Sequence, residues 1–231
     1  MSNKKYVLLS YKISKSAPLY GDTPAIEIKP QKDISKGDAC NTSIITFSNH
    51  SGTHIDAPLH FDISGRGICD YSIEELVFHS PLVLNCPKEI NTMIEIKDLE
   101  KYSESIKSCD MLIINTGFCF KRNMIEYKLN NPGIAAETAA WLRRFRNLRA
   151  VGIDTISISS IKQREEGRSA HKNFLVGKKG GTPPIVIIED MDLTGLSKSS
   201  EFEKIFVFPL FLEGSDAAPC TIVGQRINNV K

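Results

Sequence analysis

The residue types best suited to chemistry are gathered in one short segment of this chain. Three of its five histidines, His50, His54 and His60, lie within eleven residues of one another, and Asp56 stands among them. Neutral imidazole and carboxylate groups suit zinc or manganese, and a catalytic zinc typically takes three protein ligands and keeps a position for water. His50, His54 and Asp56 form such a trio. The alternative is that these are surface histidines or hydrogen-bonded core histidines.

The backbone of this segment is expected to be a loop or a bulged strand. Gly52 and Pro58 disfavour a continuous helix across it. In an extended chain alternate side chains face one way, so the even-numbered positions from His50 to His60 would share one face. Clustered imidazoles repel one another once they are protonated, and three on one face therefore favour metal ligation over the alternative.

The same segment resembles the signature of a known family. The pattern His-x-Gly-Thr-His-x-Asp-x-Pro-x-His is typical of the cyclase-like metal hydrolases, which include bacterial kynurenine formamidase and isatin hydrolase, and residues 50–60 match it at every specified position. Similar segments follow the family's order at 21–24 (Gly-Asp-Thr-Pro), 112–118 (an apolar run ending in Thr-Gly-Phe), 132–134 (Pro-Gly-Ile) and 151–157. The resemblance covers about residues 6–227.

The resemblance implies a role for each of six side chains. His50 and His54 would bind a first metal ion, His171 a second, Asp56 and Glu189 would bridge or approach both, and His60 would be the general acid/base. Taken alone, His171 stands among charged neighbours and could be solvated, and Glu189 could be an exposed strand end. We expect one or two divalent ions per chain, zinc or manganese.

The activity that the resemblance implies is hydrolysis of a C–N bond in an amide, formamide or lactam. A divalent ion with an open position lowers the pKa of bound water from 15.7 toward about 7 and polarises a carbonyl oxygen. His60 would then deliver a proton to the departing nitrogen. Two alternatives remain open, a metal-dependent lyase or cyclase acting through an enolate and a non-catalytic metal-binding protein.

Leu19 and Tyr20 are the predicted substrate-contacting residues. Kynurenine formamidases have an aromatic platform, typically tryptophan, just before an N-terminal Pro-Gly-Asp; here Leu19 is aligned with it and Tyr20 replaces the proline. Leucine offers no stacking surface, although Tyr20 has a ring of its own. The sequence therefore disfavours an aromatic formanilide and leaves the small-molecule amide or lactam unidentified.

For several other polar segments the sequence predicts a structural role or a position at the surface. Asp154 follows an apolar run, where a turn or capping role is favoured over catalysis. The loop 177–184 is longer than is usual in the family, and it lacks the order of a phosphate-binding loop, so we expect a surface turn. The charged segments 27–41 and 161–170 are expected to be exposed loops, the first an excursion over the site and the second at its rim.

The elements that must position these residues are mostly short strands. Runs rich in β-branched residues between turn signals predict strands at 6–13, 43–48, 82–84, 111–115, 150–154, 185–189, 205–212 and 221–227. Helices are predicted at 73–78, 98–106 and 135–145. This pattern agrees with the fold that the resemblance implies, an α/β (mixed α+β) swivelling β/β/α fold with mixed sheets and few helices, in a single domain over 1–231.

Composition excludes several other classes of function. The chain has 231 residues, 41% hydrophobic, and a net charge of only +2, so no electrostatic argument favours nucleic acid or an anionic membrane. It shows no signal peptide and no membrane-length apolar run, which predicts a cytoplasmic protein. Its six cysteines contain no Cys-x-x-Cys pair, and we expect free thiols. The resemblance implies a homodimer or homotetramer.

Overall fold

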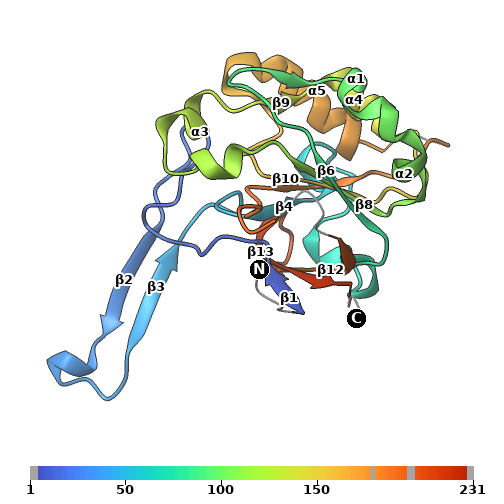
Figure 1. Ribbon diagram of the computed structural model, residues 1–231. Helices are drawn as coiled ribbons and strands as arrows, with labels where there is room; N and C mark the ends of the chain where they lie inside the picture. Colours follow the sequence, from blue (N-terminus) through green and yellow to red (C-terminus); the bar gives the residue numbers. More distant parts are fainter. Residues whose placement is uncertain (1–4, 178–179, 197–200, 228–231) are drawn as a thin grey trace.

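The body of the protein is built on one large mixed β-sheet (Figure 1). The computed structural model describes residues 5–177, 180–196 and 201–227. Within these ranges nine strands belong to the sheet, in the order β5-β12-β13-β4-β11-β10-β8-β6 with β1 paired to β13. They are β1 (Tyr6–Leu8), β4 (His54–Asp56), β5 (Val77–Phe78), β6 (Pro81–Asn85), β8 (Met111–Asn115), β10 (Ala150–Ile153), β11 (Val186–Glu189), β12 (Phe202–Pro209) and β13 (Ala217–Arg226).

Four neighbouring strands at one end of the sheet are parallel, and three of them are covered on both faces. β6, β8, β10 and β11 pair in parallel, and β8, β10 and β11 consist of nearly continuous apolar runs, as expected of strands covered on both faces. β4 is antiparallel to both β11 and β13. The start of β4 therefore lies beside the end of β11, where His54 pairs with Glu189.

Short helices cover one side of this sheet. Figure 1 shows them above β8 and β10, with β1, β12 and β13 on the opposite side. The α-helices are α1 (Ile96–Leu99), α2 (Ser103–Ser108), α3 (Ile125–Leu129), α4 (Ala136–Leu142) and α5 (Arg164–Leu175). The 3-10 helices are η1 (Ile34–Lys36), η2 (Pro58–His60), η3 (Ile68–Asp70), η4 (Glu74–Leu76), η5 (Glu100–Tyr102), η6 (Phe118–Lys121) and η7 (Ile161–Gln163). Two short strands, β7 (Met93–Ile94) and β9 (Gly133–Ile134), form a separate pair.

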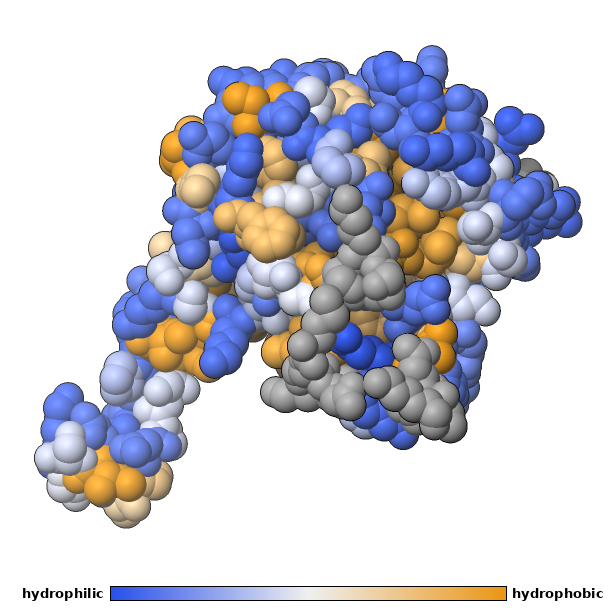
Figure 2. Space-filling model, in the orientation of Figure 1, coloured by the Kyte–Doolittle hydropathy of each residue, from blue (hydrophilic) through white to orange (hydrophobic). Residues whose placement is uncertain are grey.

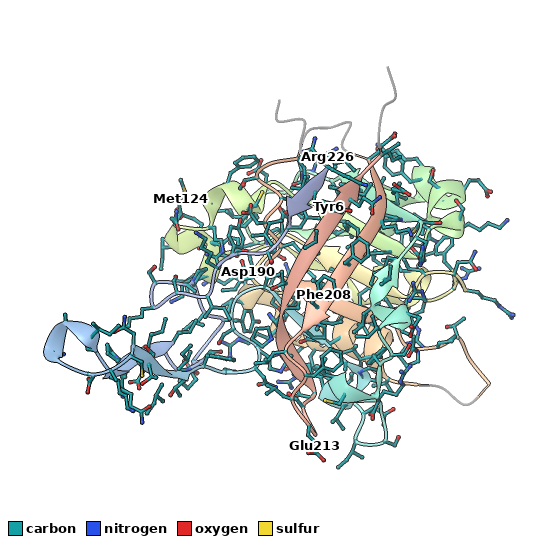
Figure 3. All side chains as sticks on the ribbon, turned by 90° about the horizontal axis from the view of Figure 1, so that it is seen from below. Tyr6, Met124, Asp190, Phe208, Glu213 and Arg226 are labelled. Atoms are coloured by element: carbon teal, nitrogen blue, oxygen red, sulfur yellow. The ribbon has the colours of Figure 1, made fainter. Side chains whose placement is uncertain are left out.

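Two apolar cores lie on the two sides of the sheet. Phe174 of α5 packs with Ile187 in the first, whereas Ile55 of β4 packs with Ile188 and Val207 in the second. Figure 3 shows β12 and β13 crossing the side that carries the second core. Because side chains alternate along a strand, burial of Ile55 on that side turns the residues before and after it to the other face.

A hairpin projects from the body as an arm (Figures 1 and 2). It consists of β2 (Glu27–Lys32) and β3 (Thr42–Thr46), paired antiparallel. The prediction of a loop over 27–41 that crosses the site was therefore wrong, although the segment is exposed. Cross-strand pairs of β-branched residues such as Ile28 and Ile45 stabilise the hairpin, and Pro30 is accommodated where the register shifts.

Other secondary-structure predictions had mixed outcomes. Strands were correctly predicted within 82–84, 111–115, 150–154, 185–189, 205–212 and 221–227, and the mixed α+β architecture with few helices is confirmed. The helix at 135–145 corresponds to α4. The helix at 73–78 was wrong, because a single 3-10 turn there leads into β5. The loop at 161–170 was also wrong, because α5 begins at Arg164 and buries Ala170, Phe174 and Leu175 on one face.

Two further observations concern the whole described chain. All six cysteines are free thiols, as predicted. Every helix in the described ranges is too short or too polar to cross a bilayer.

Candidate metal centre

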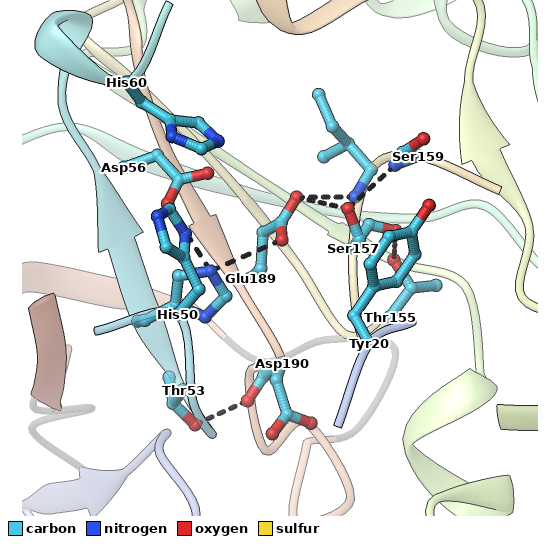
Figure 4. Close-up of polar contacts among 12 residues, drawn as sticks. Tyr20, His50, Thr53, Asp56, His60, Thr155, Ser157, Ser159, Glu189 and Asp190 are labelled. Atoms are coloured by element: carbon cyan, nitrogen blue, oxygen red, sulfur yellow. Dashed lines mark hydrogen bonds and ion pairs between the residues drawn. The ribbon is translucent and has the colours of Figure 1, made fainter. Parts of the chain in front are cut away.

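The five predicted ligands meet at one point, where β4 and β11 lie side by side, and Figure 4 labels His50, Asp56 and Glu189 among them. His54 and Asp56 share one face of β4, and Glu189 is the last residue of β11. The closest approaches are His50 Nδ1 to Asp56 Oδ1 at 3.0 Å, His54 Nε2 to Asp56 Oδ1 at 3.4 Å, His54 Nε2 to Glu189 Oε2 at 3.5 Å and His171 Nε2 to Glu189 Oε1 at 3.4 Å. Residues far apart in the sequence thus surround one small volume.

The backbone of the histidine-rich segment differs from the expected extended stretch. Only 54–56 is a strand, so one shared face from His50 to His60 was wrong. His50 approaches through a turn in which Gly52 has φ +68°, a conformation that favours glycine. His60 approaches through η2, which begins at Pro58. The glycine and the proline redirect the chain twice, and this brings both outer histidines back toward Asp56.

Backbone carbonyls orient two of the imidazoles. Nδ1–H of His54 donates to the carbonyl oxygen of Gly52 at 2.8 Å, and Nδ1–H of His171 donates to that of Gly167 at 2.8 Å. In a neutral imidazole with its proton on Nδ1, Nε2 is the nitrogen that can bind a metal ion, and Nε2 of both rings is turned toward the carboxylates. Histidines that bind metals are commonly held in this way, with the distal ring nitrogen hydrogen-bonded to a carbonyl or carboxylate.

The Glu189 carboxylate is also held in place. Its Oε1 accepts hydrogen bonds from the backbone N–H of Ile158 at 2.7 Å and from Ser157 Oγ at 3.0 Å. The next residue, Asp190, is buried in the left-handed region with φ +53° and forms a two-point ion pair with Arg122 at 2.9 and 2.7 Å. This ion pair anchors the end of β11, so the position of Glu189 is set from both sides.

Asp56 has an oxygen with no hydrogen-bond partner in the described structure. Oδ1 is buried and forms no hydrogen bond with a described residue; His50 Nδ1 lies 3.0 Å away in an ion-pair contact. Ligand atoms of His54, Asp56 and Glu189 lie within 4.8 Å of one another, and so do those of His50, Asp56 and His60. A buried carboxylate oxygen without a donor is costly unless a cation satisfies it. This donor set therefore fits a divalent ion.

The imidazoles and carboxylates of the cluster shift one another's pKa values toward their charged forms. Burial alone would raise the pKa of Asp56, but His54 and His50 outweigh it and hold that pKa well below its usual range. Burial would lower the pKa of His50, but the neighbouring carboxylates of Asp216 and Asp56 raise it to about 10. Glu189 likewise outweighs burial and raises the pKa of His171. The raised pKa values favour the protonated forms of His50 and His171, so a metal ion would have to displace protons from these two imidazoles.

Asp216 is a site residue that the sequence analysis missed. Its Oδ2 lies 2.7 Å from Nδ1 of His60 and 3.0 Å from Nε2 of His50, and its Oδ1 accepts from Asn49 Nδ2 at 2.6 Å. It stands in the turn just before β13, which pairs with β4. The only local signal was a polar residue preceding an apolar run, and many turns share that feature.

A cavity of about 400 Å³ opens above the cluster. All six residues with predicted metal or proton-transfer roles line it, and so does Tyr20. Leu19, the other predicted substrate residue, is not among the lining residues. Phe61 and Ile156 add apolar surface, and the ring of Phe61 stacks on that of His171 with centroids 5.2 Å apart. The volume is typical of small-molecule sites.

Two segments singled out in the sequence lie away from the cluster. The Asp154 carboxylate accepts hydrogen bonds from Thr116 N at 2.8 Å, Thr116 Oγ1 at 2.6 Å and Cys119 N at 3.2 Å, which is the turn-stabilising role favoured above. In the loop 177–184, residues 178–179 lie outside the described residues. Gly177, Pro183 and Pro184 line a different cavity.

The fold and the cluster together define a mixed α+β protein whose central strands deliver imidazoles and carboxylates to one cavity. Residues 7–160 match the family described as "Putative cyclase", and the chain belongs to this family. The chain is similar to kynurenine formamidase of Bacillus thuringiensis subsp. konkukian (strain 97-27), at 29% identity over 210 residues and 90% of both chains. It is also similar to kynurenine formamidase of Bacillus anthracis, at 27% identity over 98% of this chain and 100% of that one.

Solved structures agree with this membership. A potential metal-dependent hydrolase with cyclase activity matches at 25% identity and a TM-score of 0.72, over 96% of this chain and 98% of that chain. An isatin hydrolase bound to the product analogue thioisatinate matches at 15% identity and a TM-score of 0.77, over 95% and 91%. At that identity the second likeness concerns the fold alone. The predicted family resemblance and fold class are confirmed.

Proposed function

We propose that this protein is a metal-dependent hydrolase that cleaves the C–N bond of an amide, formamide or lactam. The observation that carries the proposal is the buried Asp56 oxygen, which has no hydrogen bond from any described residue and lies between the imidazoles of His50 and His54 in the lining of the cavity. The kynurenine formamidases that the chain resembles over most of its length support an amide substrate.

The residues divide into ligands and a proton carrier. His50, His54 and Asp56 would hold a first ion, and His171 and Glu189 would complete a second position that shares Asp56. A divalent ion bound there supplies a water of lowered pKa and polarises the substrate carbonyl. His60 would move a proton to the departing nitrogen from Nε2, because its Nδ1 is held by Asp216 at 2.7 Å. Tyr20, Phe61 and Ile156 would exclude water from the substrate body.

Metal identity and number are the first quantities to measure. We propose zinc or manganese, the ions that suit a set of imidazoles and carboxylates. Elemental analysis of protein purified without added metal is expected to give nearly two ions per chain, and Glu189→Gln is expected to reduce this to nearly one. Glu203→Gln on β12 is a matched control, because its carboxylate bonds to Gln225 on the surface.

Turnover of a panel of amides, formamides and lactams tests the reaction. We expect hydrolysis that is lost with a chelator, is restored by zinc or manganese, and places one oxygen from labelled water in the product. A product without labelled oxygen would indicate the lyase or cyclase alternative. A metal-loaded protein that turns over no member of the panel would indicate a binding protein and contradict the proposal.

We also propose that the protein assembles as a homodimer or homotetramer. The supporting observation is the arm, because an isolated two-stranded hairpin is only marginally stable in water. Ile34, Ile44 and Ile45 on the arm are 58%, 54% and 54% exposed, and Figure 2 shows apolar surface there. A second copy of this chain would cover them. Sedimentation of the wild type is expected to show an oligomer, and the double variant Ile44→Asp/Ile45→Asp is expected to be a monomer. A monomeric wild-type chain would contradict this assembly.

A further inference from the structure

The mouth of the cavity carries two arginines that the proposed chemistry does not use. Arg164 and Arg168 line the cavity together with the metal cluster. Both belong to α5, and they precede His171 by seven and three residues. Residues spaced three and four apart lie along one face of a helix, so the two arginines and His171 form one stripe. His171 is buried and the arginines are exposed, so the stripe leads from the centre to the solvent.

The charges of these arginines are available to a ligand. Arg164 forms no ion pair within the described ranges. Its Nη2 lies beside the turn at the cavity rim, 3.8 Å from where a Cβ on Gly21 would stand. Arg168 pairs with Glu165 at 3.1 Å, but the two side chains are 57% and 83% exposed. Such a surface pair contributes little and gives way to a better acceptor. Asp22 is the one acidic group on the lining outside the metal cluster.

The wall of the cavity also includes apolar surface. Tyr20, Phe61 and Ile156 stand there, and the Phe61 ring is stacked on His171. The lining thus combines three zones, which are the buried imidazoles and carboxylates of the metal cluster, an aromatic and aliphatic surface, and the two exposed guanidinium groups. A ligand that matches all three zones has a carbonyl at one end, an apolar middle and an anion at the other end.

We infer that the substrate is an amide or lactam with a carboxylate remote from the scissile bond, and that Arg164 and Arg168 bind this carboxylate. The inference rests on the proposed function for the identity of the scissile bond. Guanidinium groups bind carboxylates through paired, charge-assisted hydrogen bonds, which position as well as attract. Along the axis of α5, at 1.5 Å per residue, the two arginines lie about 5 and about 10 Å from His171. The carboxylate and the reacting carbonyl are therefore several bonds apart.

Matched substrate pairs that differ only in the carboxylate test this. Suitable pairs are 4-formamidobenzoate with formanilide, 6-formamidohexanoate with N-pentylformamide, and 3-(5-oxopyrrolidin-2-yl)propanoate with 5-ethylpyrrolidin-2-one. For the pair that the enzyme accepts, kcat/KM for the acid is expected to exceed that for the neutral partner by at least about tenfold, mainly through KM. In the double variant Arg164→Gln/Arg168→Gln this ratio is expected to fall toward one.

A control variant separates charge in general from charge at the mouth. Lys172→Gln removes one positive charge from the same helix, at an exposed position that does not line the cavity, and is expected to keep the ratio. A neutral substrate that is turned over as well as its acid partner would overturn the inference. So would a double variant that keeps the wild-type ratio. Both results leave the proposed hydrolase function standing.

Binding without turnover makes the inference independent of the reaction. Calorimetry with 3-phenylpropanoate, which has no bond to hydrolyse, is expected to show binding to the metal-loaded protein that weakens about tenfold or more in the double variant and weakens in high salt. If no amide is turned over, the proposed function fails and this measurement still decides the inference. Equal binding to the wild type and the double variant would assign the carboxylate to the metal cluster and overturn it.

Discussion

Asp216 holds His60 through a 2.7 Å hydrogen bond between Oδ2 and the Nδ1–H of the imidazole. This bond fixes the ring orientation and the tautomer, because Nδ1 carries the proton of the neutral imidazole. The same carboxylate oxygen lies 3.0 Å from His50, so the proposed proton carrier and a proposed ligand are tied together.

His60→Ala is expected to keep the metal and lose most of the activity. Its imidazole lines the cavity and is the proton carrier in the proposed reaction, not a metal ligand. Removal of the imidazole is therefore expected to lower kcat about 100- to 10,000-fold. Metal content by elemental analysis and kcat on the best substrate are the two measurements. Ligand atoms of His60, His50 and Asp56 lie within 4.8 Å of one another, so loss of an ion from the variant would instead make His60 a ligand.

Asp216→Asn is expected to reduce activity without unfolding the protein. The amide can still accept the hydrogen bond from His60, but it lacks the negative charge that stabilises the imidazolium, and activity is expected to fall roughly 10- to 100-fold. Asp38→Asn is the control, because that carboxylate accepts a hydrogen bond only within the tip of the arm. Full activity in Asp216→Asn would show that the orientation of His60 does not depend on charge.

Metal binding is expected to release protons at pH 8. Burial lowers the pKa of His50, but Asp216 and Asp56 outweigh it and raise the pKa to about 10 in the ion-free protein, above the ordinary value of 6.5. His50 therefore stabilises the ion-free protein fully below pH 6.5, and this contribution is lost as the pH rises through about 10. A metal ligand must be neutral, so apparent metal affinity is expected to rise with pH toward 10.

Calorimetry of metal binding in buffers with different ionisation enthalpies measures this release. At pH 8 the wild type is expected to release about one proton from His50 on binding an ion. His79→Gln, a substitution at an exposed histidine outside the cavity, is expected to leave that number unchanged. A wild-type value near zero would contradict the raised pKa.

Gly167→Ala is expected to destabilise the protein and weaken the second metal position. A Cβ at Gly167 would lie 2.6 Å from Cα of Ser159, so α5 would have to move away from that segment. The carbonyl of Gly167 also orients His171. Overpacking of this kind costs about 1–3 kcal/mol, measured by urea unfolding. Gly195→Ala is the control, because no described residue lies within 4 Å of its new Cβ; equal stability of the two variants would contradict the close approach.

Much of this protein could be predicted from short stretches of sequence. His54 and Asp56 are two positions apart on one strand, and Gly52 and Pro58 set the turns on either side, so the geometry of the first metal position is largely local. The buried strands at 111–115, 150–153 and 186–189 were also predicted, because continuous apolar runs are what strands covered on both faces require.

Two elements were decided by packing that no local pattern reveals. The segment 161–170 has a dense cluster of charges that indicates a loop, yet α5 forms there because Ala170, Phe174 and Leu175 bury one face against the sheet. The charged segment 27–41 became part of an arm, because its partner strand lies beyond it in the chain and supplies the backbone hydrogen bonds.

The sequence by itself therefore determined which residue types could bind a metal ion and, through the family it resembles, which reaction to expect. Only the tertiary structure placed Asp216 beside His50 and His60, across 166 and 156 positions of chain. It did so through the pairing of β13 with β4, whose register sets Ala217 opposite Asp56. Register between distant strands depends on how whole faces of the sheet are buried, so a polar residue in a turn acquires its role only when the chain has folded.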